Sequence, residues 1–210
     1  MIRVLVVDDH DVVRQGVKRI LADTPDMRVA GEAENGREAF SKVAKQSWDV
    51  VLLDLSMPGK GGLEVLHDLK RLRPQLPVLV FSMHTEGQYT MRAFKAGAAG
   101  YLLKDSLPQE LVSALRKVVY GGRYVSPELA EQLVVEVARK SNQPLHSELS
   151  DREYQVLCLL ATGNTVSDIA DELALSAKTI STYRTRILDK LHLKSTAELI
   201  RYAVRHQLVD

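Results

Sequence analysis

The chain has 210 residues, which is enough for two domains of ordinary size. Hydrophobic residues make up 45% of it, charged residues 26%, and 7 residues are proline, a composition that excludes disordered, collagen-like and membrane-embedded proteins. The formal net charge of +1 excludes a protein that binds nucleic acid through overall basicity, so any such surface must be local.

Targeting signals and disulfides are not expected either. Apolar runs such as residues 4–7 are too short for a signal-peptide core or a membrane span. The single cysteine, Cys158, excludes an intrachain disulfide and fits a reducing compartment. We therefore expect a cytoplasmic protein without membrane contact.

Strand-like and helix-like segments alternate in the first part of the chain. Short runs rich in β-branched residues cover 2–7, 28–31, 50–53, 77–81 and 100–103. Between them, apolar residues recur at helical spacing. Strands that are apolar on both faces predict a parallel sheet covered by helices. The expected fold class is α/β, a doubly wound, five-stranded, flavodoxin-like sheet over residues 1–121.

No further strand is expected after Gly121-Gly122. Residues 122–147 are interpreted as a linker that contains one helix and then a polar, proline-containing stretch. Four short helical segments follow. Ser150 with Glu153, and Ser195 with Glu198, have the spacing of capping boxes at helix starts. Residues 148–210 are therefore expected to form a second, smaller all-α domain of four helices.

Acidic and other polar side chains occur where the predicted strands end. Asp8 and Asp9 end the first strand and Asp54 the third. Ser82 ends the fourth and Lys104 the fifth. Parallel strands bring their carboxyl ends to one rim of the sheet, where ligands bind. Three carboxylates placed together repel one another unless a hard cation neutralises them, and Mg²⁺ suits such an oxygen cluster. The sequence thus predicts a Mg²⁺ site.

These stretches resemble the receiver domains of bacterial two-component response regulators. The matching segments are Val6-Val-Asp-Asp-His10, Val51-Leu-Leu-Asp-Leu-Ser-Met-Pro-Gly59, Ser82 and Tyr101-Leu-Leu-Lys104. The resemblance implies that Asp54 accepts a phosphoryl group from a sensor histidine kinase. It also implies that Asp9, Asp54 and the Ser56 backbone carbonyl ligate Mg²⁺, with Asp8 holding the metal more indirectly.

The same resemblance assigns the switching groups. Lys104 would contact the phosphoryl oxygens, the Ser82 hydroxyl would swing towards them, and Tyr101 would turn inward as its loop moves. Serine at 82 and bulky Met83 depart from the commonest family pattern, which leaves the phosphoryl lifetime open. The protein is not expected to be an enzyme beyond its self-catalysed phosphorylation and dephosphorylation.

Positive charge is concentrated in the second domain. Residues 176–194 carry five Lys or Arg and one Asp, a balance of 5 − 1 = +4. At helical phase, Ile180, Ile187, Leu188 and Leu191 share the core face of a helix over 176–190. The other face predicts a DNA-binding surface for a major groove. Its expected DNA contacts are Lys178, Thr179, Ser181, Thr182, Thr185, Arg186 and Lys190.

Residues 148–208 resemble the LuxR-type helix-turn-helix of the NarL/FixJ regulators. The resemblance rests on residues 149–153, 163–170, 175–183 and 190–194. It implies a supporting helix at 165–173, a recognition helix at 176–190 and a last helix at 195–206 that pairs in a homodimer on promoter DNA. Phosphorylation would control dimerisation and transcription, with RNA polymerase as a further candidate partner.

Several alternatives stay open. Arg184 either pairs with Glu153 inside the domain or contacts phosphate. His67, His146, His192 and His206 are interpreted as ordinary surface or boundary residues. A Mg²⁺-dependent phosphohydrolase of the haloacid-dehalogenase type also forms an aspartyl-phosphate, but Ser56 stands where those enzymes carry their acid. A third hypothesis treats the first domain as a protein-binding module that is not phosphorylated.

Overall fold

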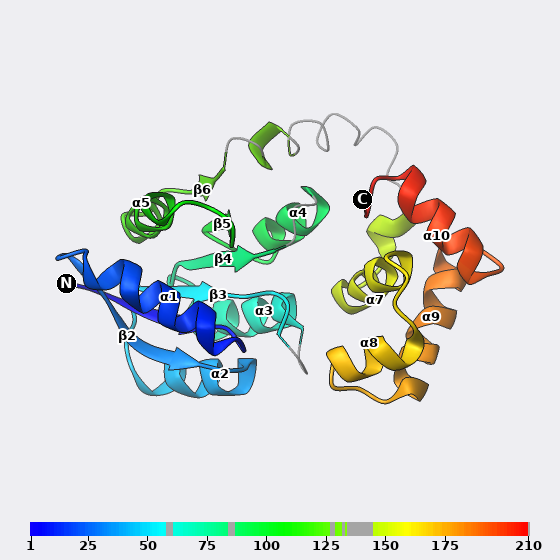
Figure 1. The fold of residues 1–210 in the computed structure, drawn as a ribbon, viewed down its shortest axis with the longest axis horizontal. Helices are drawn as coiled ribbons and strands as arrows, with labels where there is room; N and C mark the ends of the chain where they lie inside the picture. Colours follow the sequence, from blue (N-terminus) through cyan, green and yellow to red (C-terminus); the bar gives the residue numbers. More distant parts are fainter. Residues whose placement is uncertain (58–60, 84–86, 127–128, 132, 134–144, 210) are drawn as a thin grey trace. The chain divides into compact units, whose positions relative to one another are not determined.

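The computed structural model describes residues 1–57, 61–83, 87–126, 129–131, 133 and 145–209. The chain forms two compact units, Met1–Leu133 and Val134–Asp210 (Figure 1). The helix expected within residues 122–147 is present in part, since residues 129–131 are helical and the Ser126 hydroxyl accepts the Leu129 N–H at 3.4 Å. Most of the predicted polar linker lies outside the described residues.

Strands and helices alternate in the first unit, as the sequence predicts. In chain order they are β1 (Ile2–Val7), α1 (Asp11–Ala22), β2 (Met27–Ala33), α2 (Gly36–Lys45), β3 (Val50–Leu53), α3 (Gly62–Leu72), β4 (Val78–Ser82), α4 (Gly87–Lys95), β5 (Gly100–Leu103), α5 (Pro108–Val119) and β6 (Tyr124–Val125). The described strands form one sheet in the order β2-β1-β3-β4-β5-β6, and every neighbouring pair is parallel. The doubly wound α/β fold class is confirmed.

The sheet has six strands in the described part of the chain, where five were expected. Tyr124 and Val125 pair with Gly100 and Tyr101 at the edge of β5. The first unit therefore continues past the boundary expected at residue 121. A two-residue strand is too short to show an alternating pattern, and it forms because the edge of β5 offers unpaired backbone groups.

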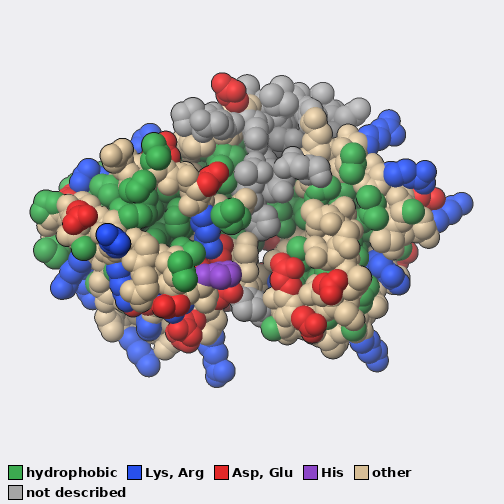
Figure 2. All heavy atoms as spheres, in the orientation of Figure 1, with side chains coloured by type: hydrophobic (Ala, Val, Ile, Leu, Met, Phe, Trp, Pro, Cys, Tyr) green, Lys and Arg blue, Asp and Glu red, His purple; other side chains and the backbone are tan. Residues whose placement is uncertain are grey.

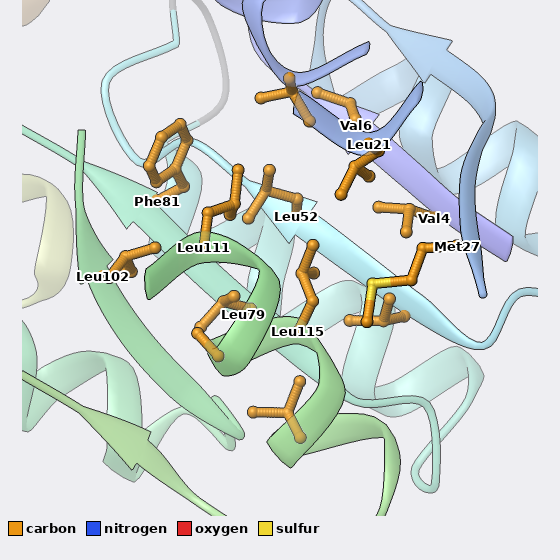
Figure 3. Packing of buried hydrophobic residues seen from close by; sticks show 14 residues of the cluster. Val4, Val6, Leu21, Met27, Leu52, Leu79, Phe81, Leu102, Leu111 and Leu115 are labelled. Carbon is orange, nitrogen blue, oxygen red and sulfur yellow. The ribbon is translucent and has the colours of Figure 1, made fainter. Parts of the chain in front are cut away.

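One face of the sheet packs against the helices α1 and α5 and forms one core of the first unit. Figure 3 shows how side chains from β1, β3, β4 and β5 meet those of the two helices. The labelled residues are Val4, Val6, Leu21, Met27, Leu52, Leu79, Phe81, Leu102, Leu111 and Leu115. Every residue of β3 and β4 is buried, as are the last four of β1. The strands that end in Asp8, Asp54 and Ser82 are thus held by packing along their length.

The second unit consists of a 3₁₀ turn and four helices in its described part. These are η2 (Leu145–Glu148), α7 (Asp151–Ala161), α8 (Val166–Glu172), α9 (Ala177–Lys190) and α10 (Thr196–Arg205). Ser150 and Glu153 form the predicted capping box at α7. At α10 the box is displaced, because Glu198 accepts the backbone N–H of Lys194 rather than that of Ser195. None of the described helices combines the length and hydrophobicity that crossing a membrane requires.

Two glycines of the first unit give a matched test of how closely α3 packs against the segment that follows β3. A Cβ on Gly62 would lie 2.3 Å from the Leu55 Cα, whereas a Cβ on Gly16 meets nothing within 4 Å. We expect Gly62→Ala to lower the free energy of unfolding by about 1–3 kcal/mol, because the backbone next to Asp54 must shift. Gly16→Ala should raise it by about 0.5–1 kcal/mol, because alanine favours the helix. Urea unfolding measures both, and equal effects would contradict the close approach of α3 to Leu55.

Candidate functional site

The acidic side chains meet at the carboxyl end of the sheet, next to the point where β1 separates β2 from β3. Asp8 and Asp54 are 2% and 1% exposed, and Asp9 is half-buried. One ligand atom from each of Asp8, Asp9, His10 and Asp54 lies within 4.8 Å of the others. The structure therefore brings together the predicted acidic residues and adds His10.

Lys104 joins two of these carboxylates. Its Nζ lies 2.7 Å from Asp8 Oδ2 and 2.9 Å from Asp54 Oδ2, so one ammonium links the ends of β1, β3 and β5. Burial raises the pKa of the Asp54 carboxyl above its usual 3.8, against the opposing effect of Lys104. Burial opposes the charge of Lys104 too, but Asp54 and Asp8 outweigh it and raise the pKa of that ammonium above 10.5.

The formal charge and the ligand oxygens of this pocket fit a hard divalent cation. Three carboxylates and one ammonium carry a formal charge of −3 + 1 = −2. Carboxylate oxygens within reach of one another are the ligands that Mg²⁺ accepts, with water in its remaining positions. Asp8, Asp9 and Asp54 are the residues that would hold the ion. Receiver domains generally use Mg²⁺ at such an acidic pocket.

The remaining pocket residues lie on the same rim. Ser82 is fully buried at the end of β4, and its carbonyl accepts the Lys104 backbone N–H at 2.9 Å. The Ser56 N–H donates to Asp54 Oδ1 at 3.0 Å, which orients the carboxylate. The Tyr101 ring is completely buried in this structure. Metal ligation by the Ser56 carbonyl and movement of Ser82 or Tyr101 stay predictions.

Arg14 is a buried support of the pocket that sequence reasoning missed. This arginine is 5% exposed, and its Nη1 donates to the Asp8 backbone carbonyl at 2.8 Å. Its Nη2 lies 3.0 Å from Asp11 Oδ1 and 2.9 Å from Glu34 Oε1. The guanidinium thus ties the end of β1 to α1 and to the turn after β2. Only the position of Arg14 on the buried side of α1, three residues after Asp11, could have signalled this role.

The exposed face of α9 carries the residues expected to contact DNA. Ile180, Ile187 and Leu191 of the predicted core face are buried, whereas Leu188 is half-buried. Lys178, Thr182, Thr185 and Arg186 are exposed, whereas Thr179, Ser181 and Lys190 are half-buried. In Figure 2, Lys and Arg side chains stand out along the edge of the second unit that α9 and α10 form.

Two threonines of this face donate their hydroxyl protons to the helix backbone. The Thr182 hydroxyl donates to the Lys178 carbonyl at 2.9 Å, and the Thr185 hydroxyl donates to the Ser181 carbonyl at 3.1 Å. Because each proton is held by the backbone, each side chain presents a methyl group and an acceptor oxygen outward. Such a surface matches base donors and the thymine methyl in a major groove.

Lys190 has a partner inside the domain. Its Nζ lies 2.6 Å from Glu153 Oε2, and Glu153 is 4% exposed. Burial alone would raise the pKa of Glu153, but hydrogen bonds from Lys190 and Ser150 outweigh it and hold that pKa below 4.5. Glu153, one of the two partners considered for Arg184, therefore pairs with Lys190. The pair fastens the end of α9 to the start of α7.

His146 is not a surface residue, contrary to expectation. It is 1% exposed, and its Nδ1 lies 3.0 Å from the Tyr202 hydroxyl of α10. Its ring also packs edge-on against His206, with the ring centroids 5.4 Å apart. The burial arises from contacts across 56 residues of sequence, which local pattern does not show. Exposed His67 and His192 and half-buried His206 fit the expectation.

Comparison with known proteins agrees with both halves of this description. The model of the response regulator receiver domain matches residues 4–116. The model of bacterial regulatory proteins of the luxR family matches residues 147–203. The chain therefore belongs to the NarL/FixJ family of two-component response regulators, DNA-binding proteins that regulate transcription.

Relatives of this chain share its whole length. It is 45% identical to response regulator GacA of Pseudomonas protegens over 210 residues, covering 100% of this chain and 99% of that protein. It is 40% identical to response regulator UvrY of Escherichia coli, covering 100% and 97%. A structure of RcsB from Salmonella enterica, bound to promoter P1flhDC with phosphomimetic BeF₃⁻, matches with a TM-score of 0.63 at 28% identity, covering 96% and 97%.

The ion pair between Glu153 and Lys190 predicts a pH-dependent stability. Glu153→Gln keeps an acceptor for the capping box but removes the charge. We expect it to lower the free energy of unfolding at neutral pH by about 1–2 kcal/mol. Because the folded pKa of Glu153 is depressed, this difference should be present above the ordinary pKa of 4.5 and vanish as pH falls through the folded value.

Urea unfolding of the full chain across this pH range measures the effect. Glu198→Gln is the matched control, since Glu198 caps α10 by accepting the Lys194 backbone N–H. A pH-independent loss in Glu153→Gln would show that packing, rather than the ion pair, is responsible.

Proposed function

We propose that this protein accepts a phosphoryl group on Asp54 from a sensor histidine kinase, and that the modification controls dimerisation and binding to promoter DNA. The observation that carries the proposal is the buried Asp54 carboxylate, which shares the Lys104 ammonium with Asp8. We place this activity in the cytoplasm, and RNA polymerase is proposed as a further partner of the DNA-bound dimer.

The residues of the pocket have distinct parts in the transfer. An Asp54 oxygen attacks phosphorus, the bond from phosphorus to the donor breaks, and the donor leaves with its electron pair. The Ser56 N–H holds the carboxylate in orientation, and Lys104 offsets negative charge on the transferring oxygens. Mg²⁺, when bound, would supply further charge compensation to those oxygens. Ser82, at the end of the neighbouring strand, is the hydroxyl proposed to follow the phosphoryl group.

The chemistry is proposed to end with modification of the protein itself. No catalytic turnover of an external substrate is assigned, because Ser56 stands where a phosphohydrolase of the haloacid-dehalogenase type carries its general acid. Steady hydrolysis of a generic phosphoester with Mg²⁺ that Asp54→Asn abolishes would instead establish such an enzyme.

Incubation with acetyl phosphate and Mg²⁺ tests the phosphoacceptor. The full chain should gain the mass of one phosphoryl group, and peptide mapping should place it on Asp54. Asp54→Asn should gain none, whereas Asp49→Asn, at the opposite end of the same strand, should behave as wild type. Sedimentation of the modified and unmodified chains measures dimerisation. An unmodified Asp54 would leave the first domain as a binding module, and equal dimerisation would remove the proposed switch.

The expected DNA contacts predict two different effects of substitution. Both are measured by binding to a duplex selected from random sequence. Arg186→Ala should weaken binding to all sequences and reduce the salt dependence by about one unit, because one phosphate contact is lost. Thr182→Val and Thr185→Val should change the preferred bases, because each removes an acceptor oxygen.

Lys190→Ala separates a structural role from a DNA contact. Because its ammonium pairs with Glu153, we expect the substitution to lower the free energy of unfolding. The salt dependence of DNA binding should change little. Urea unfolding measures the stability of Lys190→Ala. Binding measured against salt concentration gives the salt dependence, and sequencing of the bound pool gives the base preference. An unchanged base preference in both threonine variants would contradict the placement of this face in the major groove.

A further inference from the structure

His10 lies at the mouth of the acidic pocket and its side chain does not serve the helix that it begins. It occupies the N-cap position of α1 in an extended conformation, yet its ring makes no capping hydrogen bond. Serine, threonine, aspartate and asparagine are preferred at this position because they do cap. The imidazole is directed to the carboxylates instead, with Nδ1 3.0 Å from Asp9 Oδ1 and 3.4 Å from Asp8 Oδ1.

The distances from His10 Nδ1 to the Asp9 and Asp8 oxygens are close to those between neighbouring ligands of one metal ion. Neighbouring ligands of an octahedral ion with bonds of about 2.1 Å lie about 3.0 Å apart, and opposite ligands about 4.2 Å. The imidazole nitrogen and the oxygens of Asp8, Asp9 and Asp54 all lie within 4.8 Å of one another. The His10 nitrogen thus has the spacing of an additional ligand beside Asp9.

We propose that His10 Nδ1 is a nitrogen ligand in this pocket. The nitrogen ligand then raises the affinity of the site for divalent transition ions that accept imidazole, such as Mn²⁺, Co²⁺ and Ni²⁺. The comparison is with a site made of the three carboxylates alone. Mg²⁺ gains little, because it prefers oxygen and retains water. The His10 side chain is 64% exposed, so it can turn away when Mg²⁺ occupies the site. The inference rests on the proposed function, because it uses the same cation site.

A different role for His10 makes the opposite prediction. If the imidazole served only as a hydrogen-bond partner of Asp9, its removal would free that carboxylate for the metal. All four ions, Mg²⁺ included, would then bind as well as before or more tightly. A nitrogen ligand instead predicts losses that increase from Mn²⁺ through Co²⁺ to Ni²⁺, following the general order of affinities, with Mg²⁺ hardly changed.

Calorimetric titration of the full chain with each of the four ions measures this pattern. The titrations are run above neutral pH, because only an unprotonated imidazole nitrogen can ligate a metal. His10→Gln should weaken Ni²⁺ binding at least about tenfold, with smaller losses for Co²⁺ and Mn²⁺ and less than about a twofold change for Mg²⁺. His67→Gln, which removes an exposed imidazole of α3, is the matched control and should bind as wild type.

Electron spin echo spectroscopy of the Mn²⁺-loaded protein provides a direct readout. Wild type and His67→Gln should show modulation from a coordinated imidazole nitrogen, and His10→Gln should not. Asp54→Asn identifies which binding belongs to the pocket. Binding that depends on Asp54 but shows no nitrogen modulation would overturn the role of His10 and leave the proposed function intact. Divalent binding that is unchanged in Asp54→Asn would overturn the cation site itself, and the proposed function with it.

Discussion

The charge imbalance at the carboxyl end of the sheet is the constraint on which the function of the first unit depends. Asp8 and Asp54 are almost completely buried and have one ammonium, that of Lys104, between them. Buried carboxylates are costly unless their charge is compensated. The pocket therefore favours a bound cation, and the proposed phosphoryl group on Asp54 would add negative charge to it. A receiver domain can respond to such a change of charge at the carboxyl end of its sheet.

The rest of the first unit holds these charges in place. The strands that carry them are buried along almost all of their described length, so their ends cannot separate without disturbing the core. Arg14 adds a polar constraint by donating a hydrogen bond to the Asp8 backbone carbonyl at the end of β1. Repulsion between the carboxylates is thus opposed by hydrophobic packing together with a buried guanidinium.

The second unit shows that two cations of one helix, α9, can have different environments. Arg186 is exposed, whereas Lys190 is paired with a nearly buried glutamate at the start of another helix. Both contribute equally to the positive balance of this segment. The three-dimensional environment decides which charge is exposed and which stabilises the domain.

The sequence by itself determined most of the secondary-structure elements. It also determined which polar residues lie at the carboxyl end of the sheet. The spacing of apolar residues predicted five strands, the core face of α9 and the α7 capping box, because these features depend on neighbours along the chain. The cluster of Asp8, Asp9, Asp54 and Lys104 also followed, since parallel strands bring their carboxyl ends to one side.

Only the tertiary structure decided the partners of long or isolated side chains. Lys190 rather than Arg184 reaches Glu153, His146 is buried by Tyr202, and His10 faces the carboxylates. The strand β6 likewise exists only through its pairing with β5. The physical reason is that periodicity specifies which face is buried, whereas an ion pair or an edge strand depends on groups that are distant in sequence and brought together by packing.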